Sequence, residues 1–201
     1  MVAHSSDLVC IQEVGMRDGL QSAGQFVTTK DKVRLIDQLS KTGLSKIEVT
    51  SFVSPQAVPL LADAEEVLAS INRQPSVTYS ALIPNLRGLD RALAVELDEV
   101  NVVMSVSEAH NLANLRMTCE QSIEQFREIC NNRGSLRVNG TLATAFGCPF
   151  HGEVKQSTVF DWAHRYLDAG IDSCTLADPI GAAPPRQVYD LCRGLTETLP
   201  S

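Results

Sequence analysis

The sequence predicts an α/β protein in which six βα units surround a parallel sheet. Apolar segments rich in β-branched residues alternate with segments of helical period along the whole chain, which is typical of βα units. The chain has 201 residues, 44% of them hydrophobic, which is enough for one sizeable core. No repeat, low-complexity tract or linker interrupts the alternation. We therefore expect one domain over residues 1–201.

The first three units are predicted from apolar runs and the helices that follow them. Thr28 and Asp31 resemble a capping box for the first helix, and Gly43 ends it. The second helix repeats apolar residues at helical spacing after a loop kept irregular by Pro55 and Pro59. The third strand ends at Pro84. The expected strands are 8–14, 46–50 and 77–83, and the expected helices are 29–42, 62–71 and 86–95.

The last three units follow the same pattern. The fourth strand leads into a polar stretch, 105–118, which we expect to be a long functional loop. Gly170 closes the fifth helix, and Pro184 and Pro185 suit the first turn of the sixth, where a proline forfeits no helical hydrogen bond. The expected strands are 99–104, 136–143 and 173–176, and the expected helices are 119–131, 158–169 and 184–199.

Composition excludes several classes of function. A formal net charge of −7 and a pI near 5.1 argue against nucleic-acid and anionic-membrane binding, which require a basic surface. The six cysteines contain no CxxC pair, and no apolar run approaches the ~18 residues of a membrane span. The first residues carry neither a secretory nor a transit pattern. We expect a soluble, cytoplasmic protein with small-molecule or protein partners.

Polar side chains follow each predicted strand, at the carboxyl ends where βα barrels place their active sites. Three of the acids among them and an arginine could converge. The full set is Arg17, Asp18 and Gln21 after the first strand, Glu48 and Ser51, Asn85, Ser105 and Glu108, Thr144, and Asp178 after the sixth.

The run from Val14 to Ser22 is the most informative of these segments, because it places Arg17 beside Asp18 at a strand exit. A surface ion pair in a glycine turn is one interpretation, and a catalytic turn is the other. Glu48 lies within an apolar strand and needs a cationic partner, for which Arg17 is the candidate. Asp18 suits a hard divalent cation such as magnesium.

Five motifs in order resemble those of 3-hydroxy-3-methylglutaryl-CoA lyases. They are VGMRDGLQ (14–21), IEVTSFVSP (47–55), IPNLRG (83–88), FGCPFHG (146–152) and ADPIG (177–181). The resemblance covers almost the whole chain and implies a (β/α)8 TIM barrel. It implies retro-Claisen cleavage of a 3-hydroxyacyl-CoA to acetyl-CoA and a ketone, acetoacetate for the namesake substrate, in leucine degradation and ketone-body metabolism. Condensing synthases also carry an RDG turn, but VTSFVSP and GCPFHG favour the lyase.

The resemblance also implies roles for individual residues. Arg17 resembles the catalytic arginine that stabilises the enolate and contacts the substrate, and Glu48 the catalytic acid that orients it. Gln21 and Asp178 resemble substrate-binding residues, and Asp18 a ligand of a divalent metal, Mg²⁺ or Mn²⁺. The expected partner is an acyl-CoA, and homo-oligomerisation remains open.

The chain departs from the family pattern in two respects. Family members continue into a seventh strand with an HxH metal-binding pair, then a catalytic cysteine and an eighth strand, whereas this sequence ends after the sixth helix and contains no HxH. A fragment, an inactive truncated product and a partial barrel completed by another chain are the three explanations. Pro179 also stands where the common form has threonine, which leaves a different acyl group as an alternative.

Two further residues have both a functional and an ordinary interpretation. Cys148 could be a nucleophile, but a small thiol packed in a turn is more common. His110 could meet substrate at the barrel mouth, although loop histidines are more often solvated or hydrogen-bonded.

Overall fold

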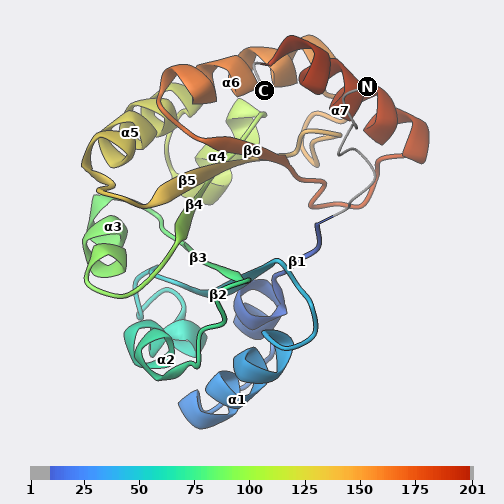
Figure 1. Cartoon of the computed structure of the whole chain (residues 1–201). Helices are drawn as coiled ribbons and strands as arrows, with labels where there is room; N and C mark the ends of the chain where they lie inside the picture. The colour runs from blue at the N-terminus through green and yellow to red at the C-terminus, as the bar shows by residue number, and fades with distance from the viewer. Residues whose placement is uncertain (1–9, 200–201) are drawn as a thin grey trace, which may run out of the picture. The chain divides into compact units, whose positions relative to one another are not determined.

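A computed structural model describes residues 10–199 of the chain. Strands and helices alternate along these residues as the sequence predicts (Figure 1). The described chain divides into two compact units, 10–83 with 87–100 and 84–86 with 101–199. Each unit is described by itself. Among the described residues, no helix is both long and apolar enough to cross a membrane.

The first unit holds three parallel strands in chain order, β1-β2-β3. Gln12 pairs with Lys46, and Lys46 pairs with Thr78 on its other side. The register of β2 against β3 shifts between Glu48 and Thr50, so that one residue of β2 has no partner there. The elements are β1 (Gln12–Glu13), η1 (Gly15–Gly19), α1 (Thr29–Leu39), β2 (Lys46–Ser51), η2 (Pro59–Leu61), α2 (Ala64–Ser70), β3 (Thr78–Leu82) and α3 (Leu86–Leu93).

The helices of the first unit pack their apolar sides on the strands. Ile36 of α1, Leu68 of α2 and Ile47 of β2 are all buried. A buried ion pair adds to this packing, since Lys32 Nζ lies 2.5 Å from Asp63 Oδ1 and donates to the Leu60 carbonyl oxygen. This pair ties α1 to the segment before α2.

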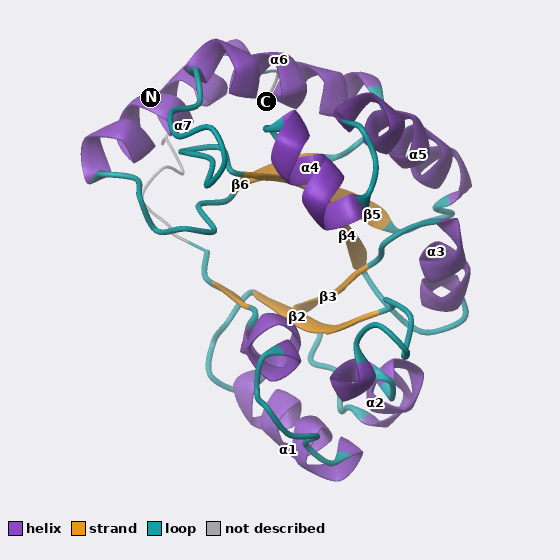
Figure 2. Cartoon of the chain, turned by 180° about the vertical axis from the view of Figure 1, so that it is seen from behind, coloured by secondary structure: helices purple, strands orange, loops and turns teal. Residues whose placement is uncertain are grey.

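The second unit contains β5 and β6, parallel and in register from Asn139–Ser173 to Leu142–Leu176. The long helices α5, α6 and α7 follow one another along the outer side of these strands (Figure 2). The helix α6 lies so close to β5 that a Cβ at Gly140 would come 2.4 Å from the Tyr166 ring. The elements are β4 (Glu99–Ser105), which begins in the first unit, α4 (Glu108–Leu115), α5 (Cys119–Asn132), β5 (Arg137–Ala143), α6 (Gln156–Asp168), β6 (Ser173–Leu176) and α7 (Pro185–Thr198).

Most predicted elements are confirmed within a few residues, and three differ. The described part of the first strand extends only over Gln12–Glu13, and residues 8 and 9 lie outside the described residues. The predicted glycine turn is a π-helical turn, Gly15–Gly19. The predicted loop 105–118 contains the helix α4, which begins at the N-cap Ser107 and ends at Arg116 in the left-handed conformation.

Candidate active site

Arg17 and Asp18 lie on the π-helical turn that follows β1. The Val14 carbonyl oxygen accepts hydrogen bonds from the backbone N–H of Arg17 at 3.1 Å and of Asp18 at 2.8 Å. Met16 is buried and anchors the turn. The Gly15 N–H donates to Glu13 Oε1 at 2.5 Å, and a Cβ at Gly15 would come 2.8 Å from that oxygen. The absence of a side chain at residue 15 therefore permits this close contact.

Glu48 pairs with Arg17, as the sequence predicts. Arg17 Nε donates to Glu48 Oε2 at 2.9 Å, and Nη2 lies 2.9 Å from the same oxygen. The Glu48 side chain is only 3% exposed and that of Arg17 is 18% exposed. A carboxylate this buried is stable as an ion only with a hydrogen-bonded cation, and Arg17 provides it. Arg17 therefore pairs with a buried carboxylate in addition to its exposed neighbour Asp18.

Asp18 forms the third member of the group. Arg17 Nη1 donates to Asp18 Oδ1 at 2.7 Å, while the Asp18 side chain is 66% exposed. Among the described residues, Asp18 Oδ2 has no hydrogen-bond partner. Asp18 thus offers a carboxylate oxygen to solvent or to a ligand, which suits a hard cation.

Two N–H groups of the Arg17 guanidinium are not used by its contacts with Glu48 and Asp18. A guanidinium carries five N–H groups, and the contacts with Glu48 and Asp18 use three of them. One N–H on each of Nη1 and Nη2 is left for a ligand oxygen. Gln21 follows in the same segment and is exposed.

Asp178 belongs to the second unit, in the loop after β6. Its Oδ2 accepts a hydrogen bond from the Ala183 N–H at 2.8 Å, and its Oδ1 is buried without a partner among the described residues. The Ala183 N–H, with further amides of the loop, lowers the pKa of Asp178, although burial opposes this. The loop therefore holds Asp178 as a carboxylate.

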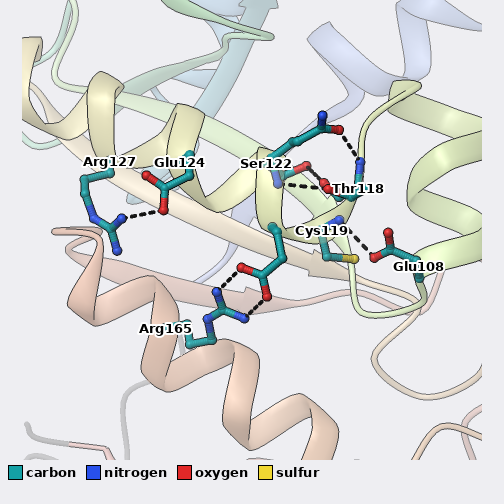
Figure 3. Close-up of polar contacts among 9 residues, drawn as sticks. Glu108, Thr118, Cys119, Ser122, Glu124, Arg127 and Arg165 are labelled. Atoms are coloured by element: carbon teal, nitrogen blue, oxygen red, sulfur yellow. Dashed lines mark hydrogen bonds and ion pairs between the residues drawn. The ribbon is translucent and has the colours of Figure 1, made fainter.

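Glu108 lies at the start of α4, in the second unit. Its Oε2 accepts a hydrogen bond from the Cys119 N–H at 3.0 Å, at the start of α5 (Figure 3). The carboxylate is committed to capping that helix, where it also complements the helix dipole. Arg165 of α6 contacts both carboxylate oxygens of Glu120 and forms an ion pair with it at the surface.

A group of residues that sequence reasoning did not connect lies after β4 and β5. Cys148 Sγ donates to Ser107 Oγ at 3.0 Å, and the Ser107 N–H donates to Thr144 Oγ1 at 3.4 Å. Burial raises the pKa of the Cys148 thiol, but the hydrogen bond with Ser107, whose hydroxyl can donate to the ionised sulfur, and those from the backbone of Phe150 and His151 outweigh it and lower the pKa. Thr144 has a φ of 58°, in the left-handed region, and no sequence pattern predicts this conformation.

Metal binding has limited support among the described residues. No group of three or more His, Cys, Asp and Glu side chains in residues 10–199 is arranged to hold a metal ion. Asp18 fits the role of a single ligand, because one of its oxygens is free and exposed.

Comparison with known proteins identifies the family. The HMGL-like family model matches residues 9–201. The chain belongs to the HMGL-like family. This HMGL-like chain is 41% identical over 195 residues to hydroxymethylglutaryl-CoA lyase YngG of Bacillus subtilis, and 38% identical over 194 residues to the mitochondrial hydroxymethylglutaryl-CoA lyase of Gallus gallus. Each match covers 96% of this chain and 65% of the relative.

Solved structures of the family have the same fold. The HMGL-like chain matches the crystal structure of the Bacillus subtilis HMG-CoA lyase with a TM-score of 0.91, at 41% identity, over 96% of this chain and 65% of that one. An HMG-CoA lyase from Acinetobacter baumannii, solved in complex with coenzyme A and 3-methylmalate, gives a TM-score of 0.92 at 47% identity, over 96% and 64%. The predicted fold, six βα units of a (β/α)8 barrel, is confirmed. The chain spans just under two thirds of the length of these relatives.

Proposed function

We propose that the protein cleaves a 3-hydroxyacyl-CoA, with 3-hydroxy-3-methylglutaryl-CoA as the preferred substrate, to acetyl-CoA and a ketone. The observation that carries the proposal is the Arg17–Glu48 pair, in which a buried carboxylate fixes a guanidinium that still has two N–H groups free. The kinship with HMG-CoA lyases supports the choice of reaction.

The chemistry requires a fixed positive charge. A base removes the proton of the 3-hydroxyl group, the C2–C3 bond breaks, and C3 becomes the carbonyl carbon of the ketone. The electron pair of that bond becomes an enolate on the thioester oxygen, and protonation at C2 then yields acetyl-CoA. The two free N–H groups of Arg17 would donate to this oxygen, where charge develops only in the transition state.

Each of the other site residues has a proposed role in the reaction. Glu48 is the acid that fixes the plane of the Arg17 guanidinium, and Asp18 would hold a divalent metal ion, Mg²⁺ or Mn²⁺. When bound, such an ion supplies Lewis acidity toward the oxygens of the substrate. Gln21 and Asp178 are proposed to bind substrate. The expected single catalytic domain, cytoplasmic location and homo-oligomer remain predictions.

The test is product analysis with the purified chain. Incubation with 3-hydroxy-3-methylglutaryl-CoA and Mg²⁺ should give acetyl-CoA and acetoacetate in equal amounts by mass spectrometry. The same assay is run on the chain co-expressed with the C-terminal third of the Bacillus subtilis relative, which tests completion by a partner chain. A panel of other 3-hydroxyacyl-CoA thioesters tests the alternative of a different acyl group. Absence of products in both preparations with every thioester would contradict the proposal.

The alternative is a non-catalytic chain, or one completed by a partner. Turnover by the chain alone would exclude both forms of this alternative, and turnover only after co-expression would establish the partner-completed form.

A further inference from the structure

His110 is a half-buried residue of α4 whose ring is held in place from one side by Ser105. Ser105 Oγ and His110 Nδ1 are 2.6 Å apart. Ser105 is itself fixed, because it is buried and its N–H donates to Asn111 Oδ1 at 2.9 Å. The contact with Ser105 therefore sets the orientation of the imidazole.

The other side of the ring meets Phe150. The two ring centroids are 5.9 Å apart and the planes are inclined by 53°. Phe150 lies at the tip of a short hairpin closed by two backbone hydrogen bonds between Cys148 and Gly152, of 2.7 and 2.8 Å. Although Phe150 is 58% exposed, its backbone is held by this hairpin. The imidazole therefore has fixed contacts on two sides.

Ser107 joins the hairpin, the start of α4 and the end of β5. Its Oγ accepts hydrogen bonds from the His110 N–H at 3.4 Å and from Cys148 Sγ at 3.0 Å. Its N–H donates to Oγ1 of Thr144, a fully buried β-branched residue with a φ of 58°. Threonine rarely adopts this backbone conformation, and strained residues of this kind concentrate at ligand-binding sites.

One ring nitrogen of His110, Nε2, is available to a ligand. Nε2 has no hydrogen-bond partner within residues 10–199, and the nearby acid Glu108 is committed to the Cys119 N–H. If the Ser105 hydroxyl donates to Nδ1, the ring proton lies on Nε2, which makes it a donor. A fixed imidazole donor suits an anionic oxygen.

We propose that His110, positioned by Ser105, contacts the substrate and donates Nε2–H to the free carboxylate of an anionic acyl-CoA. The proposal rests on the proposed lyase function, because that function supplies a thioester whose acyl group ends in a carboxylate. It assigns His110 to recognition of the acyl group and leaves the enolate to Arg17.

Nuclear magnetic resonance tests the contact without requiring turnover. In the ¹⁵N-labelled chain, addition of 3-hydroxy-3-methylglutaryl-CoA should shift the His110 ring resonances saturably, while those of His164, exposed on α6, stay unchanged. A thioester without the carboxylate, 3-hydroxy-3-methylbutyryl-CoA, should shift them much less. An unmoved His110 ring at saturating ligand overturns the inference, and so do equal shifts with the two thioesters.

Variants separate contact from structure. In the preparation that shows turnover, His110→Phe should raise KM for 3-hydroxy-3-methylglutaryl-CoA about tenfold, the worth of one charge-assisted hydrogen bond, with little change in kcat. Ser105→Ala should do the same to a smaller degree and broaden the His110 ring signals, and His164→Gln is the matched control. An unchanged KM in His110→Phe contradicts the proposal.

The Arg17 Nε resonance distinguishes the two ways of failing. If Arg17 shifts with ligand and His110 does not, the inference fails and the proposed function stands. If His110 shifts while Arg17→Met retains full turnover, the role of Arg17 in the proposed function fails and the contact at His110 stands.

Discussion

Glu48 binds Arg17 through a single oxygen, Oε2, which lies 2.9 Å from both Nε and Nη2 of the guanidinium. The pair joins the turn after β1 to the neighbouring strand β2.

Glu48→Gln should destabilise the protein, because it replaces the buried anion that pairs with Arg17 by a neutral amide and leaves only the exposed Asp18 to balance the charge. We expect a loss of about 2–3 kcal/mol in the free energy of unfolding, below the range for fully buried pairs because Arg17 is partly exposed. Urea denaturation measures it. The exposed pair Arg34–Asp31 provides the control, since Asp31→Asn should cost less than about 1 kcal/mol. Equal effects in the two variants would contradict the buried-pair interpretation.

Arg17→Met should lower turnover by about 10²–10³, the usual effect of removing one preorganised donor at a developing oxyanion. The side chain keeps a similar length, so that packing changes little. Steady-state kinetics are measured on the chain alone or co-expressed with the C-terminal segment, whichever shows turnover. Arg34→Met, on the exposed side of α1, should leave the rate unchanged. Near-normal turnover in Arg17→Met would refute the role.

Asp18→Ala should raise the Mg²⁺ concentration needed for half-maximal activity, because it removes the one exposed carboxylate of the site. Metal titration of the rate measures the shift, and Mn²⁺ should show it as well. Asp31→Ala, another exposed acid of the first unit, is the control. A titration curve identical to that of the parent chain would exclude Asp18 as a ligand.

Gly140→Ala should destabilise the second unit, because the new Cβ would overlap the Tyr166 ring at 2.4 Å. Tyr166 is fully buried and its hydroxyl donates to the Thr141 carbonyl oxygen at 2.9 Å, which limits its freedom to move. Overpacking of this kind costs about 1–3 kcal/mol, measurable by thermal or urea unfolding. Gly19→Ala is the comparison, since no atom lies within 4 Å of its added Cβ. Stability equal to that of the parent would argue against close packing of α6 on β5.

Glu65→Gln should remove a pH-dependent part of the stability. Hydrogen bonds from Arg91 lower the pKa of Glu65 below 4.5, so that the ionised form stabilises the fold. This contribution is complete above about pH 4.5 and is lost as the pH falls through the lowered pKa. The parent should therefore exceed the variant in unfolding free energy at pH 7, by under about 1 kcal/mol because the pair is partly exposed, and the difference should shrink as the pH falls below 4.5. A difference between parent and variant that stays the same above and below pH 4.5 would contradict this role of the Arg91 pair.

The sequence was sufficient for the order of strands and helices and for the central pair. Strands such as Ser173–Leu176 are short apolar runs between turn signals, and their position follows from local composition. The pairing of Glu48 with Arg17 was predictable because a carboxylate in an apolar strand requires a cation and the neighbouring strand supplied one.

The helix α4 was not predictable from local pattern. Its stability depends on the buried Asn111, which accepts from the Ser105 N–H and donates to the Met117 carbonyl oxygen and to Ser122 Oγ. These contacts join segments whose polar composition is typical of a loop. The sequence did not predict the π-helical form of the turn at Gly15–Gly19, in which Met16 is buried.

The register shift in β2 has a consequence for how the site tolerates change. The unpaired residue falls between Glu48 and Thr50. The pairing register with β3 therefore changes after Glu48 and before the loop that follows Ser51. The pairing that fixes Glu48, from Lys46 to Glu48 against β3, is complete upstream of that change. Insertions or deletions in the loop after β2 can therefore be absorbed without moving the carboxylate that holds Arg17.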